Sequence, residues 1–270
     1  KASDSFKDAK YAAMRERSVG LGVMGLHSYL QKNMIPLESV MSKVWNKKIF
    51  KNIQEKVDDA SKILAEEKGP CPDAAEYGFN ERFSNKTAIA PTASISIICG
   101  GASPGVEPIA ANSYTHKTLS GSYNVRNRYL AKILEKYDKN NEEIWSSITT
   151  NQGSVSHLDF LTDLEKNVFK TAFELDQKWL INLGADRTPY ISQAQSINIF
   201  LPADVHKKEL HQIHFQAWKK GLKSLYYCRS KSIQRAENVN SGSSTDIKKN
   251  VYSQNKLDEE TDYDECLSCQ

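Results

Sequence analysis

Apolar side chains recur at near-helical spacing in several long stretches of the chain. The strongest pattern covers residues 38–68, where a Gly-Pro pair ends it, and it predicts one long helix. Residues 127–150, 158–183 and 203–224 predict further helices, the second with apolar residues along one face. Residues 5–17 also predict a helix, because they contain Ala and long unbranched side chains and no helix breaker. The apolar positions of the strongest pattern are Val40, Val44, Ile49, Ile53, Val57, Ile63 and Leu64.

Short runs of β-branched and small residues separate these helical stretches. Residues 87–110, broken by glycine and proline, predict a strand, a tight turn and a short helix. Ile197–Leu201 is a short, mainly apolar run that suits a buried strand, and residues 225–228 suit another. Because helices alternate with short buried strands, the pattern favours an α/β fold.

Composition describes a globular chain without a membrane span. Its 270 residues, 39% hydrophobic and 26% charged, would fit one large domain or two small ones. No apolar run approaches the roughly 20 residues that cross a bilayer, and the first residues lack the apolar core of a signal peptide. Five cysteines, an odd number, form no disulfide framework, so we expect a reducing, cytoplasmic location. Since the sequence begins at Lys1 rather than methionine, we expect a piece of a larger system.

Charge is distributed unevenly. The formal net charge is +3, but residues 258–265 form a strongly acidic run, so the remainder is mildly basic. That balance suits ligands that carry phosphate but falls short of the charge density of nucleic-acid binding. Because residues 235–265 contain few apolar side chains, we predict a folded domain over 1–234 and a flexible tail over 235–270.

A glycine-rich turn resembles a dinucleotide-binding motif. Gly20, Gly22 and Gly25 have the G-x-G-x-x-G spacing, which would support a nicotinamide dehydrogenase. That motif follows a hydrophobic strand, whereas MRERSV precedes the glycines here, and Glu38 opens a long helix instead of ending a strand. The spacing therefore favours glycines that allow close packing.

A second candidate lies at the start of the predicted short helix. Pro91, Thr92, Ala93, Ser94 and Ile95 combine a proline, hydroxyls and small side chains, which leave backbone N–H groups accessible. Such donors at a helix start can bind a phosphate, although helix starts rich in Ser and Thr are common without any ligand.

Two residue pairs could carry redox chemistry. Tyr226 and Tyr227 are adjacent in a predicted buried strand, so they are either packing residues or phenols that pass an electron hole between them. Cys266 and Cys269 end the chain, and a mobile thiol–disulfide couple fits them better than zinc, which needs about four ligands. We predict no metal site, because the three histidines of the 203–224 helix lack accompanying cysteines.

Taken in order, these segments resemble the C-terminal part of the large, catalytic subunit of class I ribonucleoside-diphosphate reductases of bacterial or phage type. The resemblance rests on RERSVGLGVMGL, IAPTASISIICGGASPGVEP, YTHKTLSG, NQGSVSHL, YISQAQSINIF, HFQAWKKGLKSLYY and CLSC. It implies a share of the family's ten-stranded α/β barrel and reduction of ribonucleoside diphosphates to deoxyribonucleoside diphosphates for DNA synthesis. It also implies that Pro91–Ile95 bind the substrate diphosphate, that Tyr226 and Tyr227 relay a radical, and that Cys266 and Cys269 re-reduce the active site.

The family motif N-x-C-x-E, whose cysteine forms the thiyl radical, does not occur in this sequence. We therefore expect a C-terminal fragment or one half of a split large subunit, inactive alone and completed by an N-terminal partner chain. The resemblance implies further partners, namely a small subunit with a metal-linked radical, and thioredoxin or glutaredoxin. ATP and deoxynucleotide effectors would bind the N-terminal part, and this chain would bind no cofactor itself. The alternatives are an NAD(P)-dependent dehydrogenase and a non-catalytic assembly module with a thiol tail.

Overall fold

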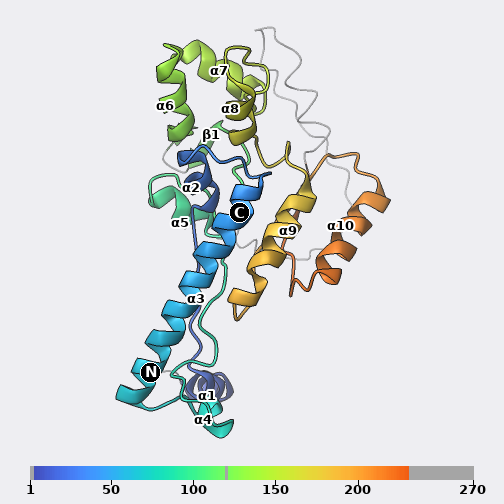
Figure 1. Ribbon diagram of the computed structural model, residues 1–270. Coiled ribbons are helices and arrows are strands. Elements are labelled where there is room, and N and C mark those ends of the chain that lie inside the picture. The colour runs from blue at the N-terminus through green and yellow to red at the C-terminus, as the bar shows by residue number, and fades with distance from the viewer. Residues whose placement is uncertain (1–2, 119–120, 231–270) are drawn as a thin grey trace, which may run out of the picture.

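The computed structural model describes residues 3–118 and 121–230, and helices are their predominant regular structure (Figure 1). The predicted tail, with Cys266 and Cys269, and the predicted boundary between residues 234 and 235 lie outside these residues. Ten α-helices are described: α1 (Lys7–Glu16), α2 (Leu26–Lys32), α3 (Val40–Lys68), α4 (Pro72–Glu76), α5 (Ala93–Ile98), α6 (Arg128–Lys136), α7 (Glu142–Thr150), α8 (Asp163–Val168), α9 (Gln177–Arg187) and α10 (Lys207–Lys219). Four strands accompany them: β1 (Ser113–Thr118), β2 (Gly121–Arg126), β3 (Ile199–Leu201) and β4 (Cys228–Ser230).

Helix α3 is the long helix that the spacing of apolar residues predicted. The Ser39 hydroxyl caps its start by accepting from Ser42 N, and the helix ends at Gly69, whose φ of 77° a residue with a side chain rarely adopts. Helix α9 packs beside α3, where Asn46 donates to the Leu183 carbonyl at 2.9 Å (Figure 1). The contact fixes α3 against the part of the chain that carries β3.

Four extended segments lie side by side and run parallel. Residues 19–21 pair with 86–88, and Ile89 pairs with Gln195. The 193–201 segment continues into β3, and β3 pairs with β4 in register Ile199 with Cys228. Chain order and spatial order therefore coincide. Within the described residues, β4 and the 19–21 segment each have a strand neighbour on one side only.

Glycines allow the first two segments to approach. A Cβ atom on Gly22 would lie 2.6 Å from the Ala88 carbonyl oxygen, which is closer than such atoms come. Gly25 has a φ of 82° and stands at the start of α2, beside Ala102. The expectation that these glycines serve close packing is confirmed.

A separate helical layer forms around α6, α7 and α8 (Figure 1, green to olive). Its core contains Leu130, Leu134, Ile148, Val168 and Phe169, all fully buried. The antiparallel hairpin β1–β2 joins this layer, with Ser113 opposite Arg126. The sequence did not predict the hairpin, because its strands carry mostly polar residues without apolar alternation.

Two predicted helices were wrong in extent. The stretch 127–150 is divided at Asp138, which has a left-handed φ of 53°, and Asn141 then caps α7 by accepting from Ile144 N. The stretch 158–183 is divided as well, because Thr162 opens α8 with a reciprocal capping box and Asp176 opens α9. Capping side chains thus overrode apolar spacing in both stretches.

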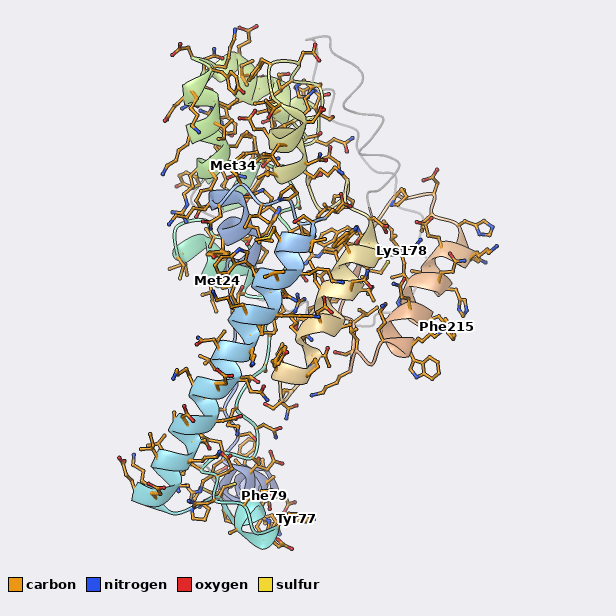
Figure 2. The ribbon with its side chains drawn as sticks, in the orientation of Figure 1. Met24, Met34, Tyr77, Phe79, Lys178 and Phe215 are labelled. Atoms are coloured by element: carbon orange, nitrogen blue, oxygen red, sulfur yellow. The ribbon has the colours of Figure 1, made fainter. Side chains whose placement is uncertain are left out.

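Helices α1 and α4 lie at the far end of α3 (Figure 1). Arg15 of α1 forms ion pairs with Asp73, at 2.5 Å, and with Glu76 of α4. Tyr77 and Phe79 follow α4 and are exposed at this end of the molecule (Figure 2). No residue of α1 is buried, and besides these ion pairs the helix is held by Ser84, which donates to the Glu16 carbonyl.

Candidate functional site

The predicted phosphate-binding residues form a strained turn ahead of α5. Thr92 has a φ of 56° and a ψ of 29°, which is unusual for a β-branched residue. Its hydroxyl does not cap α5 but accepts from Gly105 N at 2.8 Å. Because the first N–H groups of a helix lack intrahelical acceptors, those of residues 93–95 remain available to a ligand. Ser94 and Ile95 are exposed, so the turn is open to one.

The tyrosine pair stands at the start of β4. The ring centroids of Tyr226 and Tyr227 lie 4.2 Å apart, with the ring planes inclined at 56°. The main chain is held on β3, because Tyr226 N donates to the Ile197 carbonyl and Ile199 N donates to the Tyr227 carbonyl, both at 2.9 Å. The prediction of a buried strand here was wrong, since the two side chains are 41% and 44% exposed and all of β4 is exposed.

A buried carboxylate connects the turn to the tyrosines. Glu107, two residues after Gly105, accepts from Asn198 N at 2.7 Å and from Asn198 Nδ2 at 3.0 Å. The Asn198 Oδ1 atom in turn accepts from Tyr227 N at 3.0 Å. Glu107 and Asn198 are both buried. Burial raises the pKa of the Glu107 carboxyl, while hydrogen bonds from Asn198 and the positive charges of Arg229 and Arg187 act in the opposite direction.

Arg187, at the end of α9, lines the same small cavity as Glu107 and Asn198. It is buried, and it donates from Nε to Gln195 Oε1 and from a terminal nitrogen to Asn46 Oδ1. Burial lowers its pKa to about 9, whereas the charges of Glu107 and Asp186 raise it. A cavity of about 10 Å³, lined by Glu107, Arg187 and Asn198, has room for about one water molecule.

Sequence reasoning missed Glu107 and Asn198. Glu107 falls within the quoted stretch IAPTASISIICGGASPGVEP, and Asn198 within YISQAQSINIF, but neither residue carries a chemical motif of its own. The only available signal was an uncharged amide within an otherwise apolar strand. A buried amide of this kind needs hydrogen-bond partners, which another part of the chain must supply.

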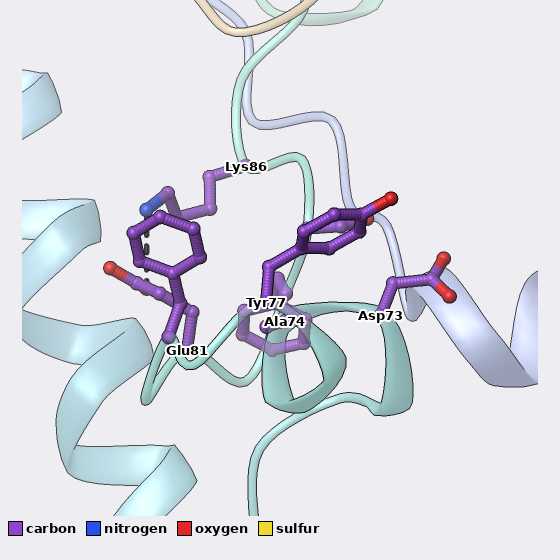
Figure 3. Close-up of a pocket in the computed structure, with 8 residues that line it drawn as sticks. Asp73, Ala74, Tyr77, Glu81 and Lys86 are labelled. Carbon is purple, nitrogen blue, oxygen red and sulfur yellow. Dashed lines mark hydrogen bonds and ion pairs between the residues drawn. The ribbon is translucent and has the colours of Figure 1, made fainter.

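A larger cavity lies beside α4 (Figure 3), at the end of α3 away from α5 (Figure 1). Its volume is about 330 Å³, and Asp73, Tyr77 and Glu81 are among its lining residues. The ammonium group of Lys86, on its wall, is 2.6 Å from Asp58 and 3.2 Å from Glu81, so this charge is already paired. Desolvation lowers and these partners raise the pKa of Lys86, with a net rise. Because the charge on its wall is already paired and it lies away from the turn and the tyrosines, this cavity is not part of the candidate site.

Three cysteines are described, and all are free thiols. Cys71 is buried, whereas Cys99 and Cys228 are exposed. In the part of the chain that the structure describes, no helix is long and apolar enough to span a membrane, and no three potential metal ligands gather.

The parallel segments and covering helices define an α/β domain, and within residues 3–118 and 121–230 both edge segments of its sheet have a strand neighbour on one side only. The model of the family described as "Ribonucleotide reductase, barrel domain" matches residues 2–82 and 73–228. The chain belongs to this family. The α/β class and the resemblance to the large subunit are thereby confirmed.

Relatives share sequence over most of this chain. The ribonucleoside-diphosphate reductase large subunits of Invertebrate iridescent virus 6 and Invertebrate iridescent virus 3 are 47% and 43% identical to it, over 89% and 90% of its length. A solved structure, the Actinobacillus ureae class Id ribonucleotide reductase alpha subunit, is 42% identical over 86% of this chain, with a TM-score of 0.79. The chain spans 25% and 39% of the two viral relatives and 42% of the solved chain.

Proposed function

We propose that this chain forms part of the large subunit of a ribonucleoside-diphosphate reductase and contributes three elements to its reaction. They are the diphosphate site at Pro91–Ile95, the radical-transfer pair Tyr226 and Tyr227, and the reducing thiols Cys266 and Cys269. One observation carries the proposal. In a chain of this family, the strained turn and the tyrosine pair contact the same short stretch of β structure, through Glu107 and Asn198.

The turn is suited to a diphosphate. Phosphate oxygens accept hydrogen bonds, and the N–H groups of residues 93–95 are donors that the helix leaves unpaired. Holding Thr92 in a left-handed conformation costs on the order of 1–3 kcal/mol, and such strain persists where the surrounding structure fixes it. Here Gly105 N fixes the Thr92 hydroxyl. The substrate class follows from family membership together with this donor set.

The tyrosine pair is suited to carry an electron hole. A phenol can lose an electron and a proton together, and two rings with centroids 4.2 Å apart can exchange the hole directly. The exposure of both rings suits a relay whose other members belong to a partner, here the small subunit and the rest of the large subunit. The radical would arrive from a metal-linked source in the small subunit.

The remainder of the large subunit would complete the sheet. β4 and the 19–21 segment each leave one edge without a strand neighbour in the described residues, and open edges favour pairing with another chain. The thiyl cysteine of the N-x-C-x-E motif and the sites for ATP and deoxynucleotide effectors would come with that part. The chain alone is therefore expected to be inactive.

The test is reconstitution. This chain is combined with an N-terminal large-subunit part that contains N-x-C-x-E, with a small subunit, and with CDP as substrate, and formation of dCDP is measured. Turnover is expected only when all parts are present. A chain that remains monomeric and gives no turnover with them would refute the proposal.

Variants then assign the roles. Tyr226→Phe and Tyr227→Phe each remove one hydroxyl and are expected to abolish turnover, whereas Tyr123→Phe, an exposed tyrosine of β2, should retain it. Full activity in either relay variant would remove that residue from the proposed pathway.

The tail thiols are tested by changing the reductant. Cys266→Ser and Cys269→Ser are expected to stop turnover driven by thioredoxin or glutaredoxin while leaving turnover with a small dithiol largely intact. Cys99→Ser, an exposed thiol elsewhere, serves as the control. Equal loss with both reductants would show that the tail has another role.

A further inference from the structure

We infer that Glu107 and Asn198 are positioning residues that couple ligand occupancy of the turn at residues 91–95 to the placement of Tyr227. The inference rests on the proposed function, because it assumes a diphosphate at the turn and a radical at the tyrosines. To the proposed function it adds Glu107 and Asn198, which belong neither to the turn nor to the tyrosine pair, and a coupling between these two sites.

The first part of the link is short and stiff. The Thr92 hydroxyl holds Gly105 N, and Glu107 follows Gly105 by two residues. Between them the chain makes a tight turn, closed by Glu107 N donating to the Pro104 carbonyl at 3.0 Å. Gly105 itself approaches the Ala90 carbonyl oxygen so closely that a Cβ atom there would lie 3.0 Å from it. A displacement of Thr92 is therefore transmitted to the Glu107 backbone with little slack.

In the second part, the Glu107 side chain accepts a hydrogen bond that a neighbouring strand would otherwise accept. Asn198 N would donate to a main-chain carbonyl in a continuous sheet, but here it donates to the Glu107 carboxylate. On the other side, Ile197 and Ile199 make ordinary main-chain hydrogen bonds to the tyrosine segment. The carboxylate thus lies beside residue 198 on the side of the 86–89 segment, opposite β4.

In the third part, the Asn198 amide can adopt one orientation only. Its Nδ2 donates to Glu107 Oε2, and its Oδ1 accepts from Tyr227 N. Rotating the amide by half a turn would place an acceptor against the carboxylate and a donor against Tyr227 N–H, and both contacts would be lost. Because Asn198 is 2% exposed and Glu107 6%, losing these contacts would leave buried polar groups without their protein partners. The carboxylate and the Tyr227 main chain are therefore tied through a single amide.

The link provides a direct reason for radical arrival to depend on bound substrate. A ligand that draws the N–H groups of residues 93–95 toward itself shifts Thr92 and, through Gly105, the Glu107 carboxylate. Asn198 then moves Tyr227 relative to the partner groups that exchange the radical with it. Since misplacement by about 1 Å can lower a rate about 100-fold, small shifts suffice for control.

The test uses the reconstituted complex with 3-fluorotyrosine at position 227. The ¹⁹F resonance is recorded with and without CDP, and CDP affinity and turnover are measured in parallel. The variants are Glu107→Gln, which puts an amide donor opposite one Asn198 donor, and Asn198→Asp, which puts a carboxylate opposite Glu107. Asn112→Asp is the matched control, because Asn112 is equally buried and donates to the Gly153 and Phe169 carbonyls in the helical layer.

In the unmodified complex, CDP is expected to shift the Tyr227 resonance. Both link variants should lose that response and at least about 10-fold in turnover, with CDP affinity changed less than about twofold, whereas Asn112→Asp should keep the response. If Asn198→Asp does not fold, Glu107→Gln carries the comparison alone.

Several outcomes would overturn the inference. They are a resonance that still responds in the folded link variants, a loss of response in Asn112→Asp as well, and a resonance that never responds although CDP binds. In each of these cases the diphosphate site itself stands. Absence of CDP binding to the unmodified complex would instead refute the diphosphate site, and the coupling with it.

Discussion

The buried imidazole of His27 offers a stability prediction that is independent of catalysis. His27 lies in α2, is 1% exposed, and accepts through Nδ1 from Ile109 N at 3.1 Å. Its ring is therefore neutral with the proton on Nε2, and it holds the segment that begins at Glu107. Burial lowers the pKa of His27 from 6.5 to about 4, because a charged ring would lose its hydration.

The sign and magnitude follow from linkage. Between pH 6.5 and 4 the unfolded chain binds a proton at this residue and the folded chain does not, so stability falls as the pH falls. One pKa unit corresponds to about 1.4 kcal/mol, so acidification from pH 7 to pH 4 should remove about 3 kcal/mol of unfolding free energy through His27 alone. Above pH 7 this contribution is constant.

The perturbation is His27→Asn, whose Oδ1 can accept from Ile109 N but does not titrate. Urea unfolding of both proteins is measured at intervals from pH 7 to pH 4. Other titrating groups are common to both proteins, so the difference between the two curves isolates His27. The original protein should lose about 3 kcal/mol more than the variant over this range. Parallel curves would refute a buried, neutral His27.

Three further substitutions test local features. Gly153→Ala would place a Cβ atom 2.3 Å from the Ala111 Cβ at a φ of 81°, and urea unfolding should show a loss of about 3 kcal/mol. Thr162→Ala removes the capping box of α8 and should cost about 1 kcal/mol in the same assay. Thr92→Val keeps the shape of the turn but removes the acceptor for the Gly105 N–H, so calorimetry on the reconstituted complex should find CDP bound about fivefold more weakly.

Sequence patterns predicted one long helix and one short buried strand. They did not identify the buried face of α3, because Val40, Val44 and Ile63 are exposed, whereas its buried residues include Asn46, Phe50 and Ala65. The 38–68 pattern corresponds to α3, and the apolar run at 197–201 contains β3. The 158–183 pattern wrongly predicted a single helix, because its apolar residues pack into two different cores. Val168 belongs to the core around α6 and α7, whereas Ala172 and Leu180 pack with Leu30 of α2. Spacing along the chain cannot distinguish one helix from two helices that pack into two cores.

Only two parts of the candidate site could be predicted from the sequence. The turn at 91–95 and the tyrosine pair have recognisable residue types, and the resemblance supplies a role for each. Their connection depends on Glu107 meeting Asn198, which is 91 positions away in the sequence. That meeting follows from the parallel register of the extended segments, and neither composition nor local spacing encodes it.

The order of the four parallel segments also has a consequence for folding kinetics. Neighbouring segments are joined by contacts between residues 67, 105 and 29 positions apart, as in Asn85 with Ser18, Thr87 with Ser192, and Asn198 with Tyr227. Loops of this length must close before any of these contacts can form, so the chain has a high contact order and is expected to fold slowly. The layer around α6, α7 and α8 is built from contacts closer in sequence and should form first. During synthesis, the 19–21 segment would remain unpaired until residues 86–88 emerge, a period in which association with another chain competes with folding.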